Sequence, residues 1–175
     1  MEIVKNDLRQ MFLRVLDNLS LDKVMPSRVR CQDNLLSVGG ECIDLSKCGK
    51  VVCVAIGKAS FEMAEQFINI VKPFVVTGVV VSSVSPEKEL PHFVHYTGGH
   101  PYPSVESIHA ASVVFGLVDD LRREDLVVYL LSGGGSAICE SPVSNNISLD
   151  DLCEFFRLLV TCGANIVEMN VLRKH

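Results

Sequence analysis

The stretch Leu126-Val127-Val128-Tyr129-Leu130-Leu131-Ser132-Gly133-Gly134-Gly135-Ser136-Ala137 decides the fold. Its apolar run, which contains β-branched and aromatic residues, ends abruptly at a serine and three glycines. Unbroken apolar runs of this kind are typical of strands that are covered on both faces of a parallel sheet. Because glycine has no Cβ atom, successive backbone N–H groups can crowd around an anion such as phosphate. We therefore expect a buried strand leading into a phosphate-binding loop, Ser132, Gly133, Gly134, Gly135 and Ser136. The alternative is a tight turn, but three glycines exceed what one turn requires.

A second apolar run, from Val51 to Gly57, is followed at once by Lys58. Apolar residues then recur at helical spacing from Phe61 to Val71, so Gly57 and Lys58 lie at a strand-to-helix turn. In open α/β sheets, ligands bind beyond the carboxyl ends of the strands, where both this turn and the glycine loop lie. The residues alone leave two roles open for Lys58: a phosphate contact, or a solvated side chain after a turn.

The remaining pattern alternates between helices and strands. We predict an amphipathic helix over residues 3–19, a loop from Pro26 to Gly40 with a short hairpin over 34–40, and strands over 75–82 and 93–96. A polar loop covers 83–91, one helix begins after Ser104, and the last begins near Ser148. The inner face of that last helix consists of Leu152, Phe156, Leu159 and Val160. The alternating strands and helices together predict an α/β fold: a doubly wound, mostly parallel sheet with helices on both faces.

The composition excludes several classes of function. The 175 residues fit one domain, and a net charge of −5 without any basic run argues against a nucleic-acid partner. No window approaches the roughly 18 apolar residues of a membrane span, and no signal peptide opens the chain. The seven cysteines are odd in number and lack a CxxC pair, so we expect reduced thiols in a cytoplasmic protein and no metal site.

Three known motifs are excluded at the candidate loops. The Walker pattern GxxxxGK[ST] would place its first glycine at Val52, inside a strand, and the dinucleotide pattern GxGxxG would need glycine or alanine at Ile138. The GxSxG elbow of hydrolases is absent around both Ser132 and Ser136. His100, between Gly99 and Pro101, could bind a ligand or hydrogen-bond the backbone. Without further context, Arg173 and Lys174 are a frayed basic terminus.

Taken together, these motifs resemble the N-terminal domain of the glycerate 2-kinase (MOFRL-type) family. The similar stretches are 56–60, 99–101 before a helix, 131–137 after a strand, and then 163–166, 168–170 and 173–175, and they occur in family order. The resemblance implies a Rossmann-like domain of a cytoplasmic kinase that uses ATP and Mg²⁺ to phosphorylate the 2-hydroxyl of D-glycerate. Lys58 would be the catalytic lysine. Gly57, His100, Arg173, Lys174 and the loop from Ser132 to Ser136 would bind phosphate or substrate.

Two departures from the family pattern shape the expectations. Ser82-Ser83-Val84-Ser85-Pro86 lacks the basic, glycine-containing sequence expected after the third strand. The chain also ends at His175, before the second domain of the family, so we expect residues 1–175 to be a partial N-terminal domain that is inactive alone and prone to form a homo-oligomer. Two other functions stay open. One is an NAD(P)-dependent hydroxypyruvate or glycerate reductase, which the missing GxGxxG disfavours, and the other is a non-catalytic binding module.

Overall fold

The computed structural model describes residues 2–144 and 146–174, with residues 2 and 3 through the backbone only. Helices α1 (Glu2–Asn18) and α2 (Leu21–Arg28) precede the strands β1 (Val29–Gln32), β2 (Leu35–Val38) and β3 (Glu41–Asp44) and the short helix η1 (Leu45–Lys47). The central part alternates β4 (Val51–Ile56), α3 (Ser60–Val71), β5 (Val76–Ser82), β6 (Phe93–Thr97), α4 (Val105–Asp119) and β7 (Leu126–Leu131). The chain closes with α5 (Gly135–Ile138), α6 (Leu149–Thr161) and α7 (Ile166–Arg173).

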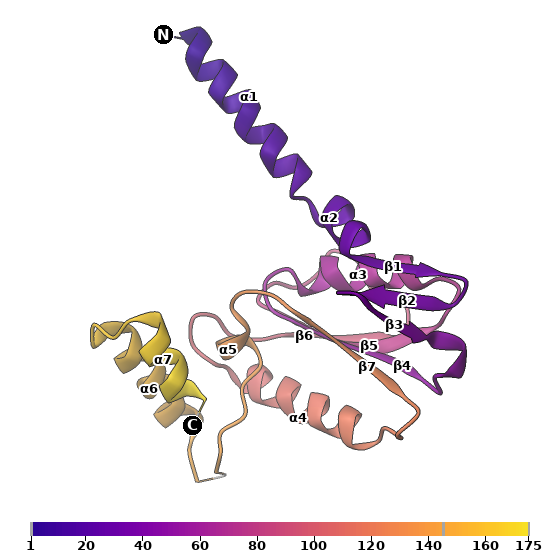
Figure 1. Ribbon diagram of the computed structural model, residues 1–175. Coiled ribbons are helices and arrows are strands. Elements are labelled where there is room, and N and C mark those ends of the chain that lie inside the picture. The colour runs from indigo at the N-terminus through magenta and orange to yellow at the C-terminus, as the bar shows by residue number, and fades with distance from the viewer. Residues whose placement is uncertain (1, 145, 175) are drawn as a thin grey trace.

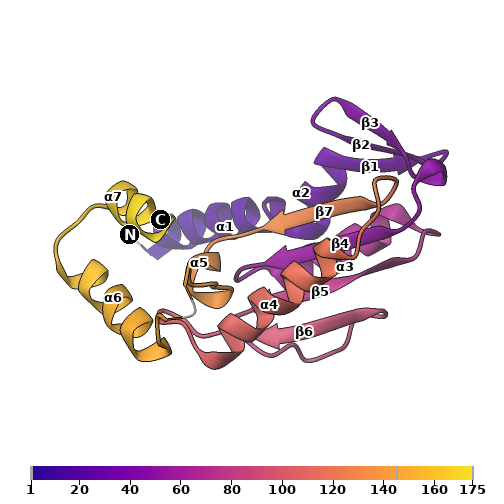
Figure 2. The ribbon, with the colours of Figure 1, turned by 90° about the horizontal axis from the view of Figure 1, so that it is seen from below.

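The central sheet has four parallel strands in the order β6-β5-β4-β7. Chain order therefore reverses between β4 and β7, which is the first half of the strand order of a Rossmann fold. Figure 2 shows all four strands running toward the side of the molecule where α5 lies. In register, Ile56 of β4 is opposite Leu131 of β7 and Val81 of β5, so the three strands end level with one another. The predicted doubly wound α/β architecture is confirmed.

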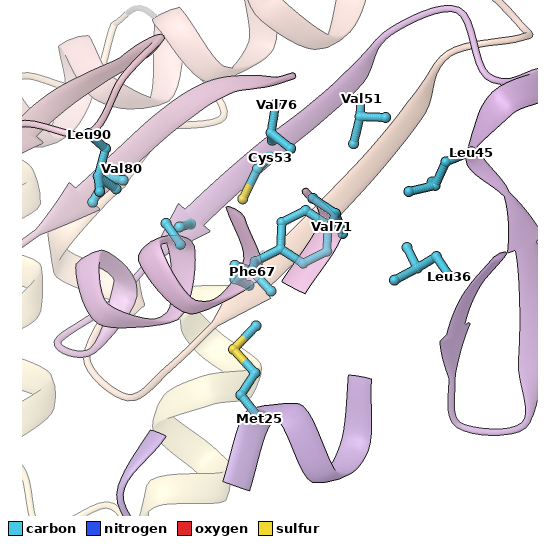
Figure 3. Close-up of a cluster of buried hydrophobic side chains, with 13 residues drawn as sticks. Met25, Leu36, Leu45, Val51, Cys53, Phe67, Val71, Val76, Val80 and Leu90 are labelled. Carbon is cyan, nitrogen blue, oxygen red and sulfur yellow. The ribbon is translucent and has the colours of Figure 1, made fainter. Parts of the chain in front are cut away.

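Helices cover both faces of this sheet, with α3 on one face and α4 on the other (Figure 1). Successive side chains of β4 alternate between the two layers: Cys53 packs with Phe67 of α3, whereas Val54 packs with Ala110 of α4. The larger of the two cores continues through α3 to Met25 of α2 and Leu36 of β2 (Figure 3). Burial to this extent raises the pKa of the Cys53 thiol to about 12, so the thiol is protonated and inert.

The segment from Pro26 to Gly40 is not the loop that we predicted. Pro26 lies inside α2, and β1, β2 and β3 form an antiparallel sheet with tight turns at Asp33-Asn34 and Gly39-Gly40. The predicted hairpin is thus one half of a three-stranded unit. Pro26 and the glycines at 39 and 40 disfavour regular structure locally, but tertiary packing outweighs them, because Met25 and Leu36 bury their side chains against the α3 layer.

Burial differs from expectation at three further places. Strand β7 is an edge strand, and its Tyr129 and Leu131 are exposed, although its apolar run predicted cover on both faces. The α1 stripe is exposed as well, because α1 projects away from the rest of the molecule (Figure 1). In α6, Leu152, Phe156 and Leu159 are buried as predicted, while Val160 is exposed.

Candidate functional site

The turn after β4 is locked to the end of β7 by contacts that involve Gly57. This glycine has a φ of +120°, and a Cβ atom built on it would lie 2.3 Å from the Ser132 hydroxyl oxygen and 2.5 Å from the Ser132 carbonyl oxygen. In turn, the Ser132 hydroxyl accepts a 3.0 Å hydrogen bond from the N–H of Ala59. The N–H of Lys58 donates to the carbonyl of Gly133 over 3.0 Å. The two predicted loops therefore form one site at the switch point of the sheet.

Lys58 lies directly against the glycine loop. A Cβ atom on Gly134 would come within 3.2 Å of Lys58 Cε, and Gly134 has a φ of +92°, which strongly favours glycine. The other two glycines are less constrained: nothing lies within 4 Å of a Cβ on Gly133, and the nearest atom to one on Gly135, Ile56 Cγ2, is at an ordinary 3.4 Å. The structure thus brings a cationic side chain alongside a bare backbone turn.

The backbone donors around Lys58 fall into two groups. The N–H groups of Lys58 and Ala59 are already used within the turn. By contrast, within residues 2–144 and 146–174 the N–H groups of Gly133 and Gly134 donate to no protein acceptor. Gly133 and Lys58 are both exposed to solvent. Free backbone donors next to an ammonium group are the arrangement that binds phosphate oxygens.

A cavity of about 600 Å³ opens beside Lys58 at the carboxyl end of β5. Strand order places Lys58 between this cavity and the glycine loop, since β4 lies between β5 and β7. Residues that we did not predict line the cavity, among them Phe61, Glu62, Ser82, Ser85, Glu87 and Lys88. The sequence contained a signal for Ser82, because this residue ends a third apolar strand close to where Lys58 and Ser132 follow theirs.

His100 lies outside this cavity, on the exposed loop between β6 and α4. The loop itself packs closely on α5: a Cβ atom on Gly98 would be 1.9 Å from the Ile138 carbonyl oxygen. The next N–H, that of Gly99, donates to the hydroxyl of Ser107, the buried N3 residue of the α4 capping box. A ligand-binding role for His100 stays a prediction.

Arg173 and Lys174, which we grouped together, have different surroundings. The guanidinium carbon of Arg173 lies 4.5 Å from the centroid of the Phe156 ring, and its Nε is buried without a hydrogen-bond partner among the described residues. Arg173 and Glu140 both line a second cavity, which lies against α6. Burial raises the pKa of the Glu140 carboxyl, and the Arg173 charge acts in the opposite direction. Lys174 is exposed. Neither basic residue lines the cavity beside Lys58, and their substrate contacts stay predictions.

The described part of the chain contains no group of three or more histidine, cysteine, aspartate or glutamate side chains placed to hold a metal ion. All seven cysteines are free thiols. None of the helices in the described ranges is long and apolar enough to cross a membrane.

The fold and the clustered strand ends define a Rossmann-like α/β domain with its candidate site at the switch point of the sheet. Residues 7–175 match the family described as "Domain of unknown function (DUF4147)", and the chain belongs to that family. It is 35% identical to the glycerate 2-kinase of Pyrococcus horikoshii over 99% of this chain, and 37% identical to the D-glycerate 2-kinase of Thermotoga maritima over 72%. A putative hydroxypyruvate reductase of Agrobacterium vitis is 38% identical over 73% of the chain.

Solved structures agree with these sequence comparisons. A crystal structure of a Pyrococcus horikoshii protein superimposes on 96% of this chain with a TM-score of 0.81 at 34% identity. That of the Thermotoga maritima glycerate kinase covers 72% of the chain with a TM-score of 0.65 at 37% identity. The chain spans 39% of the length of the Pyrococcus glycerate 2-kinase and 30% of the Thermotoga enzyme.

Proposed function

We propose that this chain is the Rossmann-like part of a kinase that transfers the γ-phosphate of ATP to the 2-hydroxyl of D-glycerate. The observation that carries the proposal is the position of Lys58 against Gly134, beside the free N–H groups of the glycine loop. Phosphoryl transfer needs positive charge and precise positioning more than covalent chemistry, and this site offers both. The glycerate 2-kinases among the relatives support the same activity.

The residues fit the phosphates of ATP, whose oxygens would accept from the Gly133 and Gly134 N–H groups while the Lys58 ammonium neutralises the transferred group. Mg²⁺ would neutralise further phosphate charge, bound mainly by phosphate oxygens and water as is usual for this ion. Because the described residues offer no cluster of three acids, we assign it no protein ligand and derive no step through it.

We further propose that residues 1–175 supply one wall of the cleft, and that a second domain supplies the other. The share of each relative that the chain spans supports this division. A cleft with one wall holds the reactants loosely, so we expect residues 1–175 alone to be inactive. The free thiols are compatible with a cytoplasmic reaction.

A reductase acting on hydroxypyruvate is the second candidate, because it is the name given to two Agrobacterium vitis relatives. The turn after β4 argues against it. That turn presents Lys58 and uses its N–H groups internally, whereas a dinucleotide fingerprint leaves them free for a pyrophosphate. Oxidation of NADH or NADPH with hydroxypyruvate, without any phosphorylation of glycerate, would favour the reductase over the kinase.

The kinase proposal is tested by replacing Lys58 in the protein made from its complete reading frame. We expect wild type to form 2-phosphoglycerate from ATP and D-glycerate, and Lys58→Ala to lower kcat at least about a hundredfold. Lys72→Ala is the matched control, since Lys72 caps the opposite end of α3 and should leave turnover unchanged. Normal turnover in Lys58→Ala would refute the role of Lys58. No phosphoryl transfer by wild type, together with no heat of ATP·Mg²⁺ binding, would favour a non-catalytic module.

A further inference from the structure

The loop that joins β5 to β6, residues 83–92, forms the outer side of the cavity beside Lys58 and is held by three side-chain contacts. The hydroxyl of Ser82 lies 2.9 Å from His95 Nε2, and the hydroxyls of Ser85 and Thr97 are 3.0 Å apart. Farther along, Lys88 forms an ion pair with Glu65 of α3. The Ser82–His95 contact is the innermost of the three, because Ser82 is buried, whereas the Ser85–Thr97 and Lys88–Glu65 contacts are exposed.

The direction of the Ser82–His95 hydrogen bond follows from the atoms around it. The Ser82 hydroxyl is also 2.5 Å from the carbonyl oxygen of Val84, which can only accept, so the single hydroxyl proton is donated there. Ser82 must then accept from His95, which requires a proton on Nε2. Burial lowers the pKa of His95, so at neutral pH the ring is uncharged and Nδ1 carries no proton. The pair is therefore not a nucleophile with its general base.

The hydrogen bond between His95 and Ser82 supports the wall of the cavity. Ser82 and Val84 both line it, and the hydroxyl of Ser82 fixes the first turn of the loop by bonding the Val84 carbonyl. The N–H of Gly98 also donates to the Ser82 carbonyl over 2.8 Å, so the end of β5 is tied to the end of β6 through main chain as well. His95 thus acts on the cavity through Ser82 and does not itself line it.

The chemistry of the cavity favours an uncharged, hydroxyl-bearing group over a small anion. Its volume of about 600 Å³ is well within the range of sites for drug-sized ligands. Phe61, Val84 and Pro86 provide apolar surface. Among the charged residues of the lining, the acids Glu62, Glu65 and Glu87 outnumber the lysines Lys58 and Lys88, so the lining disfavours a carboxylate, and its acids can accept from hydroxyls. In folds with this strand order, the group that binds the ribose of a dinucleotide follows the second strand, which here is β5. A nucleoside fits these features and glycerate does not.

We propose that His95 is a positioning residue that acts through Ser82 to hold the 83–92 loop as the wall of a nucleoside-binding pocket beside Lys58. The proposal rests on the proposed kinase function and adds to it the place of the nucleotide: phosphates at the glycine loop, nucleoside under the 83–92 loop. His95 is then a determinant of ATP affinity and not of the chemical step.

Steady-state kinetics of five variants in the complete protein test this role. Losing a half-buried hydrogen-bond donor should raise the KM for ATP in His95→Leu about tenfold, with kcat and the KM for D-glycerate within about twofold of wild type. His95→Gln keeps an amide N–H near the Nε2 position and should restore most of the ATP affinity. His109→Leu is the matched control, an exposed histidine that packs edge-on against Tyr96 in the α4 layer. When Ser82→Ala is already present, adding His95→Leu should change the KM for ATP by less than about twofold.

Three results would overturn the proposal: an unchanged KM for ATP in His95→Leu, a rise in the KM for glycerate instead, or independent effects of His95→Leu and Ser82→Ala. A wild-type protein without kinase activity would refute the proposed function, and calorimetric titration with ATP would then test the role of His95 separately. Weaker ATP binding by His95→Leu than by wild type would still support the nucleoside pocket. Absence of ATP binding by wild type would refute that pocket. Long-range ¹H–¹⁵N NMR gives a check independent of ligands, since a proton on Nδ1 in place of Nε2 would exclude His95 as the donor to Ser82.

Discussion

Gly57 is the residue on which the geometry of the site depends most directly. We predict that Gly57→Ala lowers the free energy of unfolding by about 2–4 kcal/mol, because its Cβ would overlap the Ser132 backbone at a φ that L-residues avoid. The matched control is Gly133→Ala, whose Cβ would meet no atom within 4 Å, and which should change stability by less than about 1 kcal/mol. Urea unfolding of both variants measures the difference, and equal losses would contradict this account.

Residue types at strand ends could be predicted from the sequence, but their surroundings could not. Lys58, Gly57 and the glycine loop were predicted to share an edge of the sheet, and they do. The close contact of Gly57 with Ser132 could not be predicted, because it depends on the relative position of two strands far apart in the chain. Arg173 illustrates the same point: only the folded chain brings its guanidinium over the Phe156 ring.

At the scale of elements, strong periodicity sufficed for β4, α3, β5, α4, β7 and α6, whose positions were all predicted. Within the unit from α2 to β3, only the hairpin was predicted, because the strands are only four residues long and Pro26 suggested an interruption. Burial was harder to predict than structure type. A parallel-strand pattern in β7 indicated a covered strand, but nothing in the sequence marks which strand of a sheet is at its edge.

Helix α1 is the element whose side chains contribute least to the stability of the domain. Leu8 and Phe12 are 60% and 62% exposed, so we expect the double variant Leu8→Gln/Phe12→Gln to change the free energy of unfolding by less than about 1 kcal/mol. Phe67→Ala in the α3 core, where Phe67 is 1% exposed, should cost about 3–5 kcal/mol. The α1 stripe is also the surface through which we expect a homo-oligomer to form.

Sedimentation velocity checks that second expectation. The double variant should sediment as a smaller species than wild type at the same concentration. An unchanged distribution would mean that α1 takes no part in self-association. In urea unfolding at concentrations where the chain is monomeric, a loss of several kcal/mol would mean that the α1 stripe is covered within the chain itself.

For the molecule as a whole, the buried clusters are very unequal in size. The α6–α7 end packs on α5 through Ala137, Leu152 and Phe156, and α7 has no buried residue of its own, whereas the layer around α3 buries thirteen residues. We predict that backbone amides of α6 and α7 exchange with solvent well before those of β4, through local opening that leaves the sheet intact. Hydrogen-exchange mass spectrometry measures this order, and simultaneous exchange of α6 and β4 would indicate a single cooperative unit.

The pairing of β4 with β7 has a consequence for how the protein folds. Val51 faces Leu126 across the sheet, so the chain must close a loop of roughly 75 residues before these strands can meet, and long-range parallel pairing of this kind forms slowly. The hydrogen bonds from Ala59 to Ser132 and from Lys58 to Gly133 can form only once β4 and β7 have paired. During synthesis, β4, α3, β5 and α4 all leave the ribosome before β7, so an early intermediate can be helical and compact while lacking the proposed phosphate site. Nucleotide binding during refolding would therefore report completion of the sheet, with a time course later than the recovery of helical circular dichroism.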